Sequence, residues 1–375
     1  MVQGKGLDDF EAKADRSTPT ELVAAFDLRS ATGKSTGAGR YLLSMALAAM
    51  DLPDVKVRAY LAKTDLDLPS QIDKVTVDAG GPRWHLAVWR HLRAHPVDAY
   101  VSTSLIVPAL PGVKALPAVL DVSCFRVPQH QKLRTRTFER LFLGRVACRH
   151  PLIFLCESAG SDVRDLFPRA RGVVVPPWSP TPPATTHDEA ALERLGAHRP
   201  YLLMVGTVEP RKNVSLAVRT TRELRRRGHD LRLVIAGQRG WARKAELREI
   251  HAAQAEGIVA WPGYVSDDER DALYAGASAL LFPSVYEGFG LPLLEAMAAN
   301  LPCVCSATPV FEEVAGGAAI MADPHNPREW ADRLEELIGR PELAQKLRAA
   351  GLERAASFSR ERTAHAFRAA LAQER

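Results

Sequence analysis

Short apolar runs alternate with helical patterns along two long stretches of the chain, an order typical of parallel α/β layers. The first stretch begins at residues 22–26 and continues to about Pro176, and the second begins at residues 201–206. Between them, residues 176–183 contain five prolines, which excludes a helix or a central strand there. The pattern therefore predicts two Rossmann-like domains joined by a linker.

The predicted boundaries divide the chain into five parts. Residues 1–20 are polar and charged, lack the apolar run of a signal peptide, and are expected to form a disordered leader. The N-terminal domain, the linker, the C-terminal domain and a final helix are expected at residues 21–180, 181–198, 199–358 and 359–375.

The second half carries the clearer pattern. Five strands are predicted, at residues 201–206, 231–236, 258–261, 279–282 and 302–306. Helical patterns lie between them, for example at residues 214–227 and 267–275, and others end the chain at residues 327–338, 341–358 and 360–373. In open sheets of this kind ligands bind at the carboxyl ends of the strands, so a site is expected there.

The composition is that of an ordinary globular protein, with 46% apolar and 25% charged residues among 375. No uninterrupted apolar run approaches about 18 residues, so no transmembrane helix is expected. The cysteines are odd in number, lack zinc spacing and are expected to be buried thiols of a cytosolic protein. They are Cys124, Cys148, Cys156, Cys303 and Cys305.

Positive charge is concentrated in the first half of the chain. Residues 1–175 contain 24 Lys and Arg against 18 Asp and Glu, a net charge of +6. Residues 176–375 contain 25 against 26, a net charge of −1. The basic half could face an anionic membrane or a phosphate-bearing acceptor.

The segment from Glu287 to Glu295 has the residues of a phosphate-binding turn. It follows a predicted strand, and Gly288 and Gly290 permit positive φ and close approach of a ligand. Pro292 suits the start of a helix, whose amide groups attract a diphosphate. Glu287 would then lie within reach of a sugar, and Glu295 would accept ribose hydroxyls. The alternative is that both glutamates are solvated and the glycines only turn the chain.

Arg211 and Lys212 follow the predicted strand at residues 201–206, before a helix that Asn213 is expected to cap. Two adjacent cations at the carboxyl end of a strand could clamp a diphosphate and stabilise charge on a leaving group. A solvated Arg-Lys pair is the alternative.

Three motifs resemble those of the retaining glycosyltransferase family 4, which has the GT-B fold. They lie in this order at residues 206–213, 263–267 and 287–295. The resemblance covers residues 201–340 closely and extends more weakly to residues 37–41 and 156–158. It implies an α/β GT-B fold, with two Rossmann-like domains that face each other across a central cleft and a C-terminal helix that crosses back to the N-terminal domain.

The resemblance also implies where the substrates bind, with the donor on the C-terminal domain and the acceptor mostly on the N-terminal domain. Arg211 and Lys212 would bind the donor phosphates, and Glu295 would hold the ribose. Glu287 would be the catalytic residue that orients the transferred sugar without attacking it. Sugar and phosphate would also meet Gly288, Phe289, Gly290 and Leu291. No metal or other cofactor is implied, because positive side chains and helix ends neutralise the diphosphate.

Gly37 and Gly39 belong to a glycine-rich loop before a predicted helix at residues 41–49. This loop is interpreted as the edge of the cleft near the donor phosphates, and a simple turn is the alternative. Residues 33–35 superficially suggest a P-loop, but Leu28 stands where that motif needs its first glycine. The sequence therefore does not favour an ATPase.

Many members of the family carry a His-Asp pair after a strand of the N-terminal domain. Asp121 matches the aspartate, but Leu120 stands where the histidine would be. Asp121 is a candidate catalytic contact to the acceptor or to the transferred sugar, with a structural turn as the alternative. The acceptor-side chemistry of the family is not carried over.

Residues 132–149 form a basic segment with one acid, Glu139, and with apolar residues from Phe138 to Val146 at helical spacing. Its basic residues are Lys132, Arg134, Arg136, Arg140, Arg145 and Arg149. Two interpretations stay open: a membrane-surface helix that seeks anionic lipid, or a core-facing helix with a solvated basic side.

The predicted function is retaining transfer of a hexose from a nucleoside diphosphate sugar to a hydroxyl acceptor. The product would be a glycan, a cell-envelope polysaccharide or a glycosylated natural product. Resemblance to a mannosyltransferase-like branch makes GDP-mannose the first expectation, with UDP- or dTDP-sugars as alternatives and a lipid-linked acceptor as one option. The expected location is the cytoplasm or the inner face of the cell membrane.

Three other functions are alternatives within the same fold: a sugar-nucleotide epimerase, a phosphorylase, or a degenerate sugar-nucleotide-binding module. No lysine motif for pyridoxal phosphate supports the phosphorylase, and the glutamates at both ends of the Glu287 segment argue against degeneration. Basic and aromatic residues are not interleaved, so nucleic acid is not an expected partner.

Overall fold

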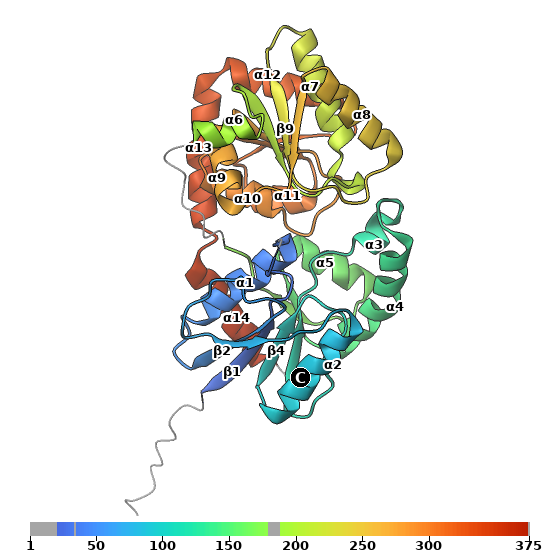
Figure 1. Cartoon of the computed structure of the whole chain (residues 1–375), viewed down its shortest axis with the longest axis vertical. Coiled ribbons are helices and arrows are strands. Elements are labelled where there is room, and N and C mark those ends of the chain that lie inside the picture. Colours follow the sequence, from blue (N-terminus) through green and yellow to red (C-terminus); the bar gives the residue numbers. More distant parts are fainter. Residues whose placement is uncertain (1–20, 34, 179–187, 374–375) are drawn as a thin grey trace, which may run out of the picture.

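The computed structural model of the chain describes residues 21–33, 35–178 and 188–373. Within them, an N-terminal unit fills the lower half of Figure 1 and a C-terminal unit the upper half. The expected leader, residues 1–20, lies outside the described residues, as do residues 181–187 of the expected linker. The rest of that linker contains a helix, α6 (Glu189–Arg194), which packs against the C-terminal unit.

The N-terminal unit is built on a five-stranded parallel sheet in the order β3-β2-β1-β4-β5. Its strands are β1 (Leu22–Asp27), β2 (Val55–Leu61), β3 (Asp73–Thr76), β4 (Ala99–Ser102) and β5 (Lys114–Pro117). A smaller parallel sheet pairs β6 (Leu152–Phe154) with β7 (Gly172–Val174). The helices are α1 (Gly37–Ala49), α2 (Pro82–Ala94), α3 (Ser123–Arg126), η1 (Pro128–His130), α4 (Leu133–Arg149) and α5 (Glu157–Leu166).

The C-terminal unit is built on a six-stranded parallel sheet in the order β10-β9-β8-β11-β12-β13. Its strands are β8 (Tyr201–Val205), β9 (Arg232–Ala236), β10 (Val259–Gly263), β11 (Ala279–Phe282), β12 (Cys303–Ser306) and β13 (Ile320–Ala322). The helices after α6 are η2 (Pro210–Lys212), α7 (Val214–Arg226), α8 (Lys244–Ala255), α9 (Asp267–Gly276), α10 (Leu291–Ala298), α11 (Pro309–Ala315), α12 (Pro327–Gly339), α13 (Pro341–Ala356) and α14 (Arg360–Ala372).

The five strands predicted for this unit are confirmed, and β13 is an additional strand. It has three residues at the edge of the sheet, too few to form a recognisable apolar run. Both sheets are flanked by helices, so the predicted pair of Rossmann-like units is confirmed (Figure 1). No helix in the described part of the chain is long and apolar enough to cross a bilayer.

Strand β8 illustrates why apolar runs become central strands of these sheets. All five of its residues are buried, because helices cover both faces of a parallel sheet. Leu202 and Met204 pack into the cluster that contains Trp330 of α12. Leu203 and Tyr201 point the other way, into the cluster that contains residues of α10.

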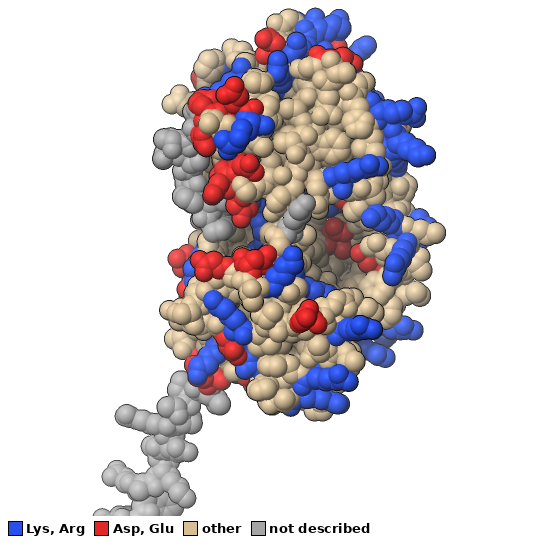
Figure 2. All heavy atoms as spheres, in the orientation of Figure 1, with Lys and Arg blue, Asp and Glu red and all other residues tan. Residues whose placement is uncertain are grey.

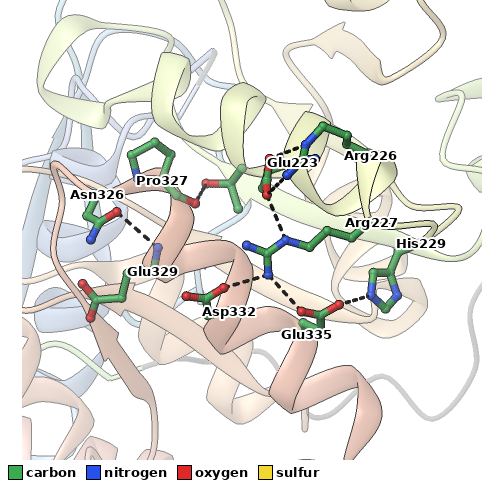
Figure 3. Close-up of polar contacts among 10 residues, drawn as sticks. Glu223, Arg226, Arg227, His229, Asn326, Pro327, Glu329, Asp332 and Glu335 are labelled. Carbon is green, nitrogen blue, oxygen red and sulfur yellow. Dashed lines mark hydrogen bonds and ion pairs between the residues drawn. The ribbon is translucent and has the colours of Figure 1, made fainter.

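A network of ion pairs joins α7 to α12 (Figure 3). Arg227, directly after α7, lies 2.9 Å from Glu223 and reaches Asp332 at 2.7 Å and Glu335 at 2.9 Å. His229 lies 2.8 Å from the other oxygen of Glu335. Because exposed ion pairs stabilise a fold only modestly, this network makes a small contribution to the packing of the two helices.

Helix α14 leaves the C-terminal unit and packs against α1 of the N-terminal unit, as its red ribbon in the lower half of Figure 1 shows. Phe367 is fully buried there, with its ring 5.4 Å from the ring of Phe26. Arg360, at the start of α14, lies 2.7 Å from Asp51. The predicted return of the last helix to the N-terminal domain is confirmed.

All five cysteines are free thiols, and four of them are buried as expected. The prediction was wrong for Cys148, which is exposed. It lies on α4, where Val146 and Ala147 occupy the side that faces the core and Cys148 falls on the outer side.

Candidate active site

A cavity of about 290 Å³ lies between the two units, where the carboxyl ends of both sheets meet. The N-terminal unit contributes the first turn of α1 and residues after β5, and the C-terminal unit contributes residues after β8, β9, β10 and β11. The predicted site residues that line it are Gly37, Asp121, Arg211, Lys212, Glu287, Gly288, Phe289, Gly290 and Leu291. Two predicted residues, Gly39 and Glu295, do not line it.

Glu287 is the centre of a buried cluster of charges. Its two carboxylate oxygens lie 2.5 Å from Lys212 Nζ and 2.5 Å from Arg211 Nη1. Arg211 Nε also lies 2.5 Å from Oε1 of Glu209, so two cations face two carboxylates. The motifs after β8 and after β11 therefore meet in one cluster, as the prediction of a shared site requires.

A short turn places the two cations. The 3-10 turn η2 directs Arg211 and Lys212 into the cavity, and Val285 donates its backbone N–H to the carbonyl of Arg211 at 2.9 Å. Asn213 lies at the N-cap position of α7, but its side chain does not cap the helix. The prediction of a side-chain cap was wrong, because the Asn213 backbone is left-handed and its amide donates to the carbonyl of Pro324 at 2.7 Å.

Charge pairing sets the protonation of this cluster. Burial alone would raise the pKa of Glu287, but Arg211 and Lys212 outweigh burial and lower that pKa to about 2. Burial lowers the pKa of Lys212 against the opposing effect of Glu287. Glu287 is thus an anion at neutral pH that can orient a hydroxyl-bearing ligand but cannot supply a proton.

The Glu287→Gln variant should be less stable than the wild type at pH 7, and the deficit should shrink as the pH falls from about 4.5 to about 2. The pKa of Glu287 in the folded chain, about 2, lies below its ordinary value of 4.5. The charged form therefore stabilises the fold above about pH 4.5, and this contribution is lost as the carboxylate is protonated. Urea unfolding midpoints at pH 7, 4 and 3 measure the effect.

The exposed Glu353 provides the control for this experiment, because Glu353→Gln changes the same chemistry outside the cluster. A deficit of Glu287→Gln that stays constant from pH 7 to pH 3 would contradict the pairing of Glu287 with the two cations.

The turn between β11 and α10 brings the two units into contact. A Cβ atom on Gly288 would lie 1.6 Å from the carbonyl oxygen of Leu120 in the N-terminal unit, so only glycine fits there. Gly290 has a φ of 94° and precedes α10, where positive φ favours glycine. Cys156 donates its thiol to the carbonyl of Gly288 at 3.3 Å.

Further contacts between the units flank this turn. The carboxylate of Glu313, on α11, accepts the backbone N–H groups of Glu157 at 2.8 Å and Ser158 at 2.7 Å, at the start of α5. The hydroxyl of Tyr286 donates to Asp162 of α5 at 2.7 Å. The two units therefore touch on the α5 side of the cavity.

The glycine-rich loop of the N-terminal unit is part of a helix. The helix predicted at residues 41–49 begins at Gly37, with Thr36 as its N-cap. Gly37 lines the cavity, whereas a Cβ on Gly39 would lie 2.1 Å from the carbonyl oxygen of Ser30. Gly39 therefore serves the close packing of α1 on the preceding loop, and the structure gives it no place in the cavity wall.

Asp121 and Leu120 follow β5 and line the N-terminal side of the cavity. Oδ1 of Asp121 accepts a hydrogen bond from the backbone N–H of Ser123 at 2.8 Å. Asp121 therefore stabilises a turn, which was the alternative to a catalytic contact. The backbone of Leu120 meets Gly288, so Leu120 lies at the contact between the units.

Glu295 lies one turn into α10, as predicted, but its carboxylate is engaged by other side chains. Tyr274 donates its hydroxyl to one oxygen at 2.9 Å, and Arg40 Nη1 lies 3.1 Å from the other. Arg270 Nε is 3.9 Å from the same oxygen that Tyr274 contacts. Arg40 and Arg270 line the cavity, so Glu295 is separated from it by these two side chains.

Sequence reasoning missed four charged residues of the cavity: Arg40, Glu209, Asp267 and Arg270. Asp267 belongs to the recognised motif at residues 263–267. Glu209 and Arg40 belong to motifs that were recognised, at residues 206–213 and 37–41, so their position beside predicted residues was a usable signal. Arg270 lies inside a helix with acidic neighbours and offered no such signal. Within the described residues, no three His, Cys, Asp or Glu side chains are placed to share a metal ion.

Residues 189–354 match the family model described as glycosyl transferases group 1. The O-antigen chain mannosyltransferase B of Escherichia coli is 30% identical over 260 residues, which are 66% of this chain and 67% of that relative. The serotype-specific mannosyltransferase WbdA of Escherichia coli is 37% identical over 143 residues, 38% of this chain and only 18% of that relative.

Among solved structures, the sucrose-phosphate synthase of Thermosynechococcus elongatus superposes with a TM-score of 0.75 at 18% identity. The superposition covers 93% of this chain and 98% of that one, so the likeness extends over both units. The family match covers most of the C-terminal unit, including Arg211, Lys212 and the segment from Glu287 to Glu295. The chain therefore belongs to the group 1 family of glycosyl transferases and is a glycosyltransferase.

Proposed function

We propose that the protein transfers a hexose, with mannose as the first candidate, from a nucleoside diphosphate sugar to a hydroxyl group of a glycan acceptor, with retention of anomeric configuration. The buried cluster of Glu287, Arg211 and Lys212 at the cavity carries this proposal. Mannose is favoured because the two Escherichia coli relatives are named as mannosyltransferases. GDP-mannose is accordingly the first candidate donor, and UDP- or dTDP-sugars are the alternatives.

The proposed reaction breaks the bond between the anomeric carbon and the diphosphate, and forms a bond from the acceptor oxygen to the same face of that carbon. The acceptor proton leaves with the departing diphosphate. Arg211 and Lys212 would stabilise its growing negative charge, and the anionic Glu287 would hold the sugar hydroxyls. Positive side chains of the cavity and the N-terminus of α10 would together neutralise the diphosphate, so we propose that no metal or cofactor takes part.

A thermal-shift panel of GDP, UDP, ADP and dTDP tests the donor assignment. A nucleoside diphosphate that binds only the folded chain should add about 2.7 kcal/mol of stability at a concentration of 100 Kd. We expect GDP to give the largest shift in melting temperature. A panel without any shift would contradict the donor site at the cavity. A larger shift with UDP or dTDP would indicate a UDP- or dTDP-sugar as the donor in place of GDP-mannose.

We also propose that the protein works in the cytoplasm, in peripheral contact with the inner face of the cell membrane through α4. Leu143, Val146 and Ala147 face the core, yet α4 has further apolar side chains on its outer side. The exposed fractions are 67% for Leu133, 38% for Phe138 and 59% for Leu141.

Basic residues surround these side chains, and Figure 2 shows Lys and Arg gathered along the edge of the molecule where α4 lies. Exposed apolar residues beside positive charges match the surface of an anionic bilayer. The same face would suit a lipid-linked acceptor, which is the option we favour for the acceptor.

Flotation with vesicles tests this contact. The protein should float with vesicles rich in phosphatidylglycerol at low salt and should remain at the bottom with neutral vesicles. Leu141→Asp should reduce flotation, whereas Ile338→Asp, at an exposed apolar position on α12, should leave it unchanged. If the wild type did not float with anionic vesicles at low salt, the proposed contact of α4 with the membrane would be contradicted.

A further inference from the structure

Arg40 links the two units across the cavity. It lies on α1 of the N-terminal unit, and its Nη1 is 3.1 Å from Oε1 of Glu295 on α10. The side chain of Arg40 lines the cavity and is 26% exposed, whereas that of Glu295 is 8% exposed. This ion pair therefore closes one wall of the cavity in front of a buried carboxylate.

Glu295 is the group expected to hold the ribose of the donor, so ribose and Arg40 compete for the same carboxylate. The other oxygen of Glu295 accepts from Tyr274, which is 1% exposed and belongs to the same unit as Glu295. Tyr274 is thus fixed by burial, while Arg40 comes from the opposite unit and is more exposed. A ribose that reaches Glu295 would displace Arg40 rather than Tyr274.

The displaced guanidinium would remain inside the cavity. Gly37, one turn before Arg40, lines the same cavity, and its Cβ position is 4.0 Å from Leu291 at the start of α10. The first turns of α1 and α10 therefore face each other there. Nε of Arg40 is buried and, within the described residues, has no hydrogen-bond partner, so Arg40 has an unused donor in this position.

The charge balance of the cavity supplies the reason for a further cation. Arg211 and Lys212 are matched by the carboxylates of Glu209 and Glu287, so their cluster is close to neutral. A diphosphate carries more than one negative charge and needs additional positive charge when it leaves water. Arg40 can provide it once Glu295 binds ribose hydroxyls instead.

We propose that Arg40 is a donor-binding residue that pairs with Glu295 until the ribose takes that carboxylate, and then binds the diphosphate of the same donor. This inference rests on the proposed function, since its ligand is a nucleoside diphosphate. The ribose must bind Glu295 before Arg40 is free to contact the diphosphate. Recognition of these two parts of the donor is therefore interdependent.

Isothermal titration of GDP and guanosine, with UDP and uridine as a second pair, tests the proposal in the full chain. In Arg40→Gln the nucleoside should bind as well as before or better, because its competitor for Glu295 is gone. The diphosphate should lose a charged contact, so the ratio of diphosphate to nucleoside affinity should fall by about tenfold or more. In Glu295→Gln the ratio of diphosphate to nucleoside affinity should be unchanged or higher, because Arg40 no longer has an ion pair with Glu295. Arg93→Gln, at an exposed position on α2, is the control.

If Arg40→Gln bound nucleoside and diphosphate more tightly by the same factor, the proposal would be overturned, since Arg40 would then only compete for Glu295. An unchanged ratio in a protein that binds GDP or UDP would also overturn it and leave the donor assignment intact. If the wild type bound neither diphosphate, the proposed donor site itself would fail, and the assignment of Arg40 with it.

Discussion

Replacing Arg211 with alanine is expected to lower the rate of sugar transfer by about 10²–10³-fold, the usual loss when one group that stabilises transition-state charge is removed. Arg211 is held by Glu287 and Glu209 at 2.5 Å each, so its guanidinium is already oriented before a diphosphate departs. Lys212→Ala should cause a similar loss. Initial rates at saturating donor and acceptor measure the effect on kcat.

Arg219→Ala provides the matched control, because Arg219 lies on α7, just after the same turn, with 55% of its side chain exposed. It should transfer sugar at the wild-type rate. Arg211→Lys should recover only part of the activity, because an ammonium group cannot reproduce the fork of a guanidinium. A folded Arg211→Ala variant with wild-type kcat would show that this side chain does not stabilise the leaving group.

The double variant Arg211→Ala/Lys212→Ala should lose less than the product of the two single losses. Both cations contact Glu287, so removal of either one already disturbs the position of that carboxylate.

Gly288→Ala is expected to lower kcat by about 100-fold, the loss that a displacement of roughly 1 Å in an active site can cause. The added methyl group would overlap the carbonyl oxygen of Leu120, at 1.6 Å, and the contact is with backbone that cannot rotate away. The two units would have to separate at this point, which moves Asp121 away from Glu287 across the cavity. Each unit should still fold, because the clash lies between them.

Kinetic measurements and small-angle scattering together test this expectation, since the variant should be both slower and more open. Gly339→Ala is the control, because a Cβ at Gly339, the last residue of α12, meets nothing within 4 Å. Wild-type kcat in Gly288→Ala would mean that the approach of Gly288 to Leu120 is not needed for the reaction.

Much of the fold could be predicted because its determinants are local. Strand β8 is a run of five apolar residues. Ser266 is the N-cap of α9 and forms a capping box with Glu269, three positions later. The start of α1 was misplaced because glycines at its first turn suggested a loop. Gly37 and Gly39 are tolerated there because Thr36 caps the helix and Ser30 packs against Gly39.

Part of the site could also be predicted, because the positions of its residues depend on local sequence patterns. Arg211 and Glu287 each lie in the segment that follows a strand, and the carboxyl ends of the strands of one parallel sheet share an edge. The partner of Glu295 could not be predicted, since Arg40 belongs to the other unit and the pair depends on how the two units meet. Leu120 likewise gives no hint in the sequence that its backbone touches Gly288.

The placement of α14 also determines where this chain could be joined to the donor half of another glycosyltransferase. Arg360 and Phe367 belong to the last segment of the chain, yet they contact Asp51 and Phe26 near its start. A chimaera that takes a foreign donor half should therefore switch back to the native sequence at about residue 358. A fusion that replaced everything after the linker would leave the N-terminal core without the helix that completes it.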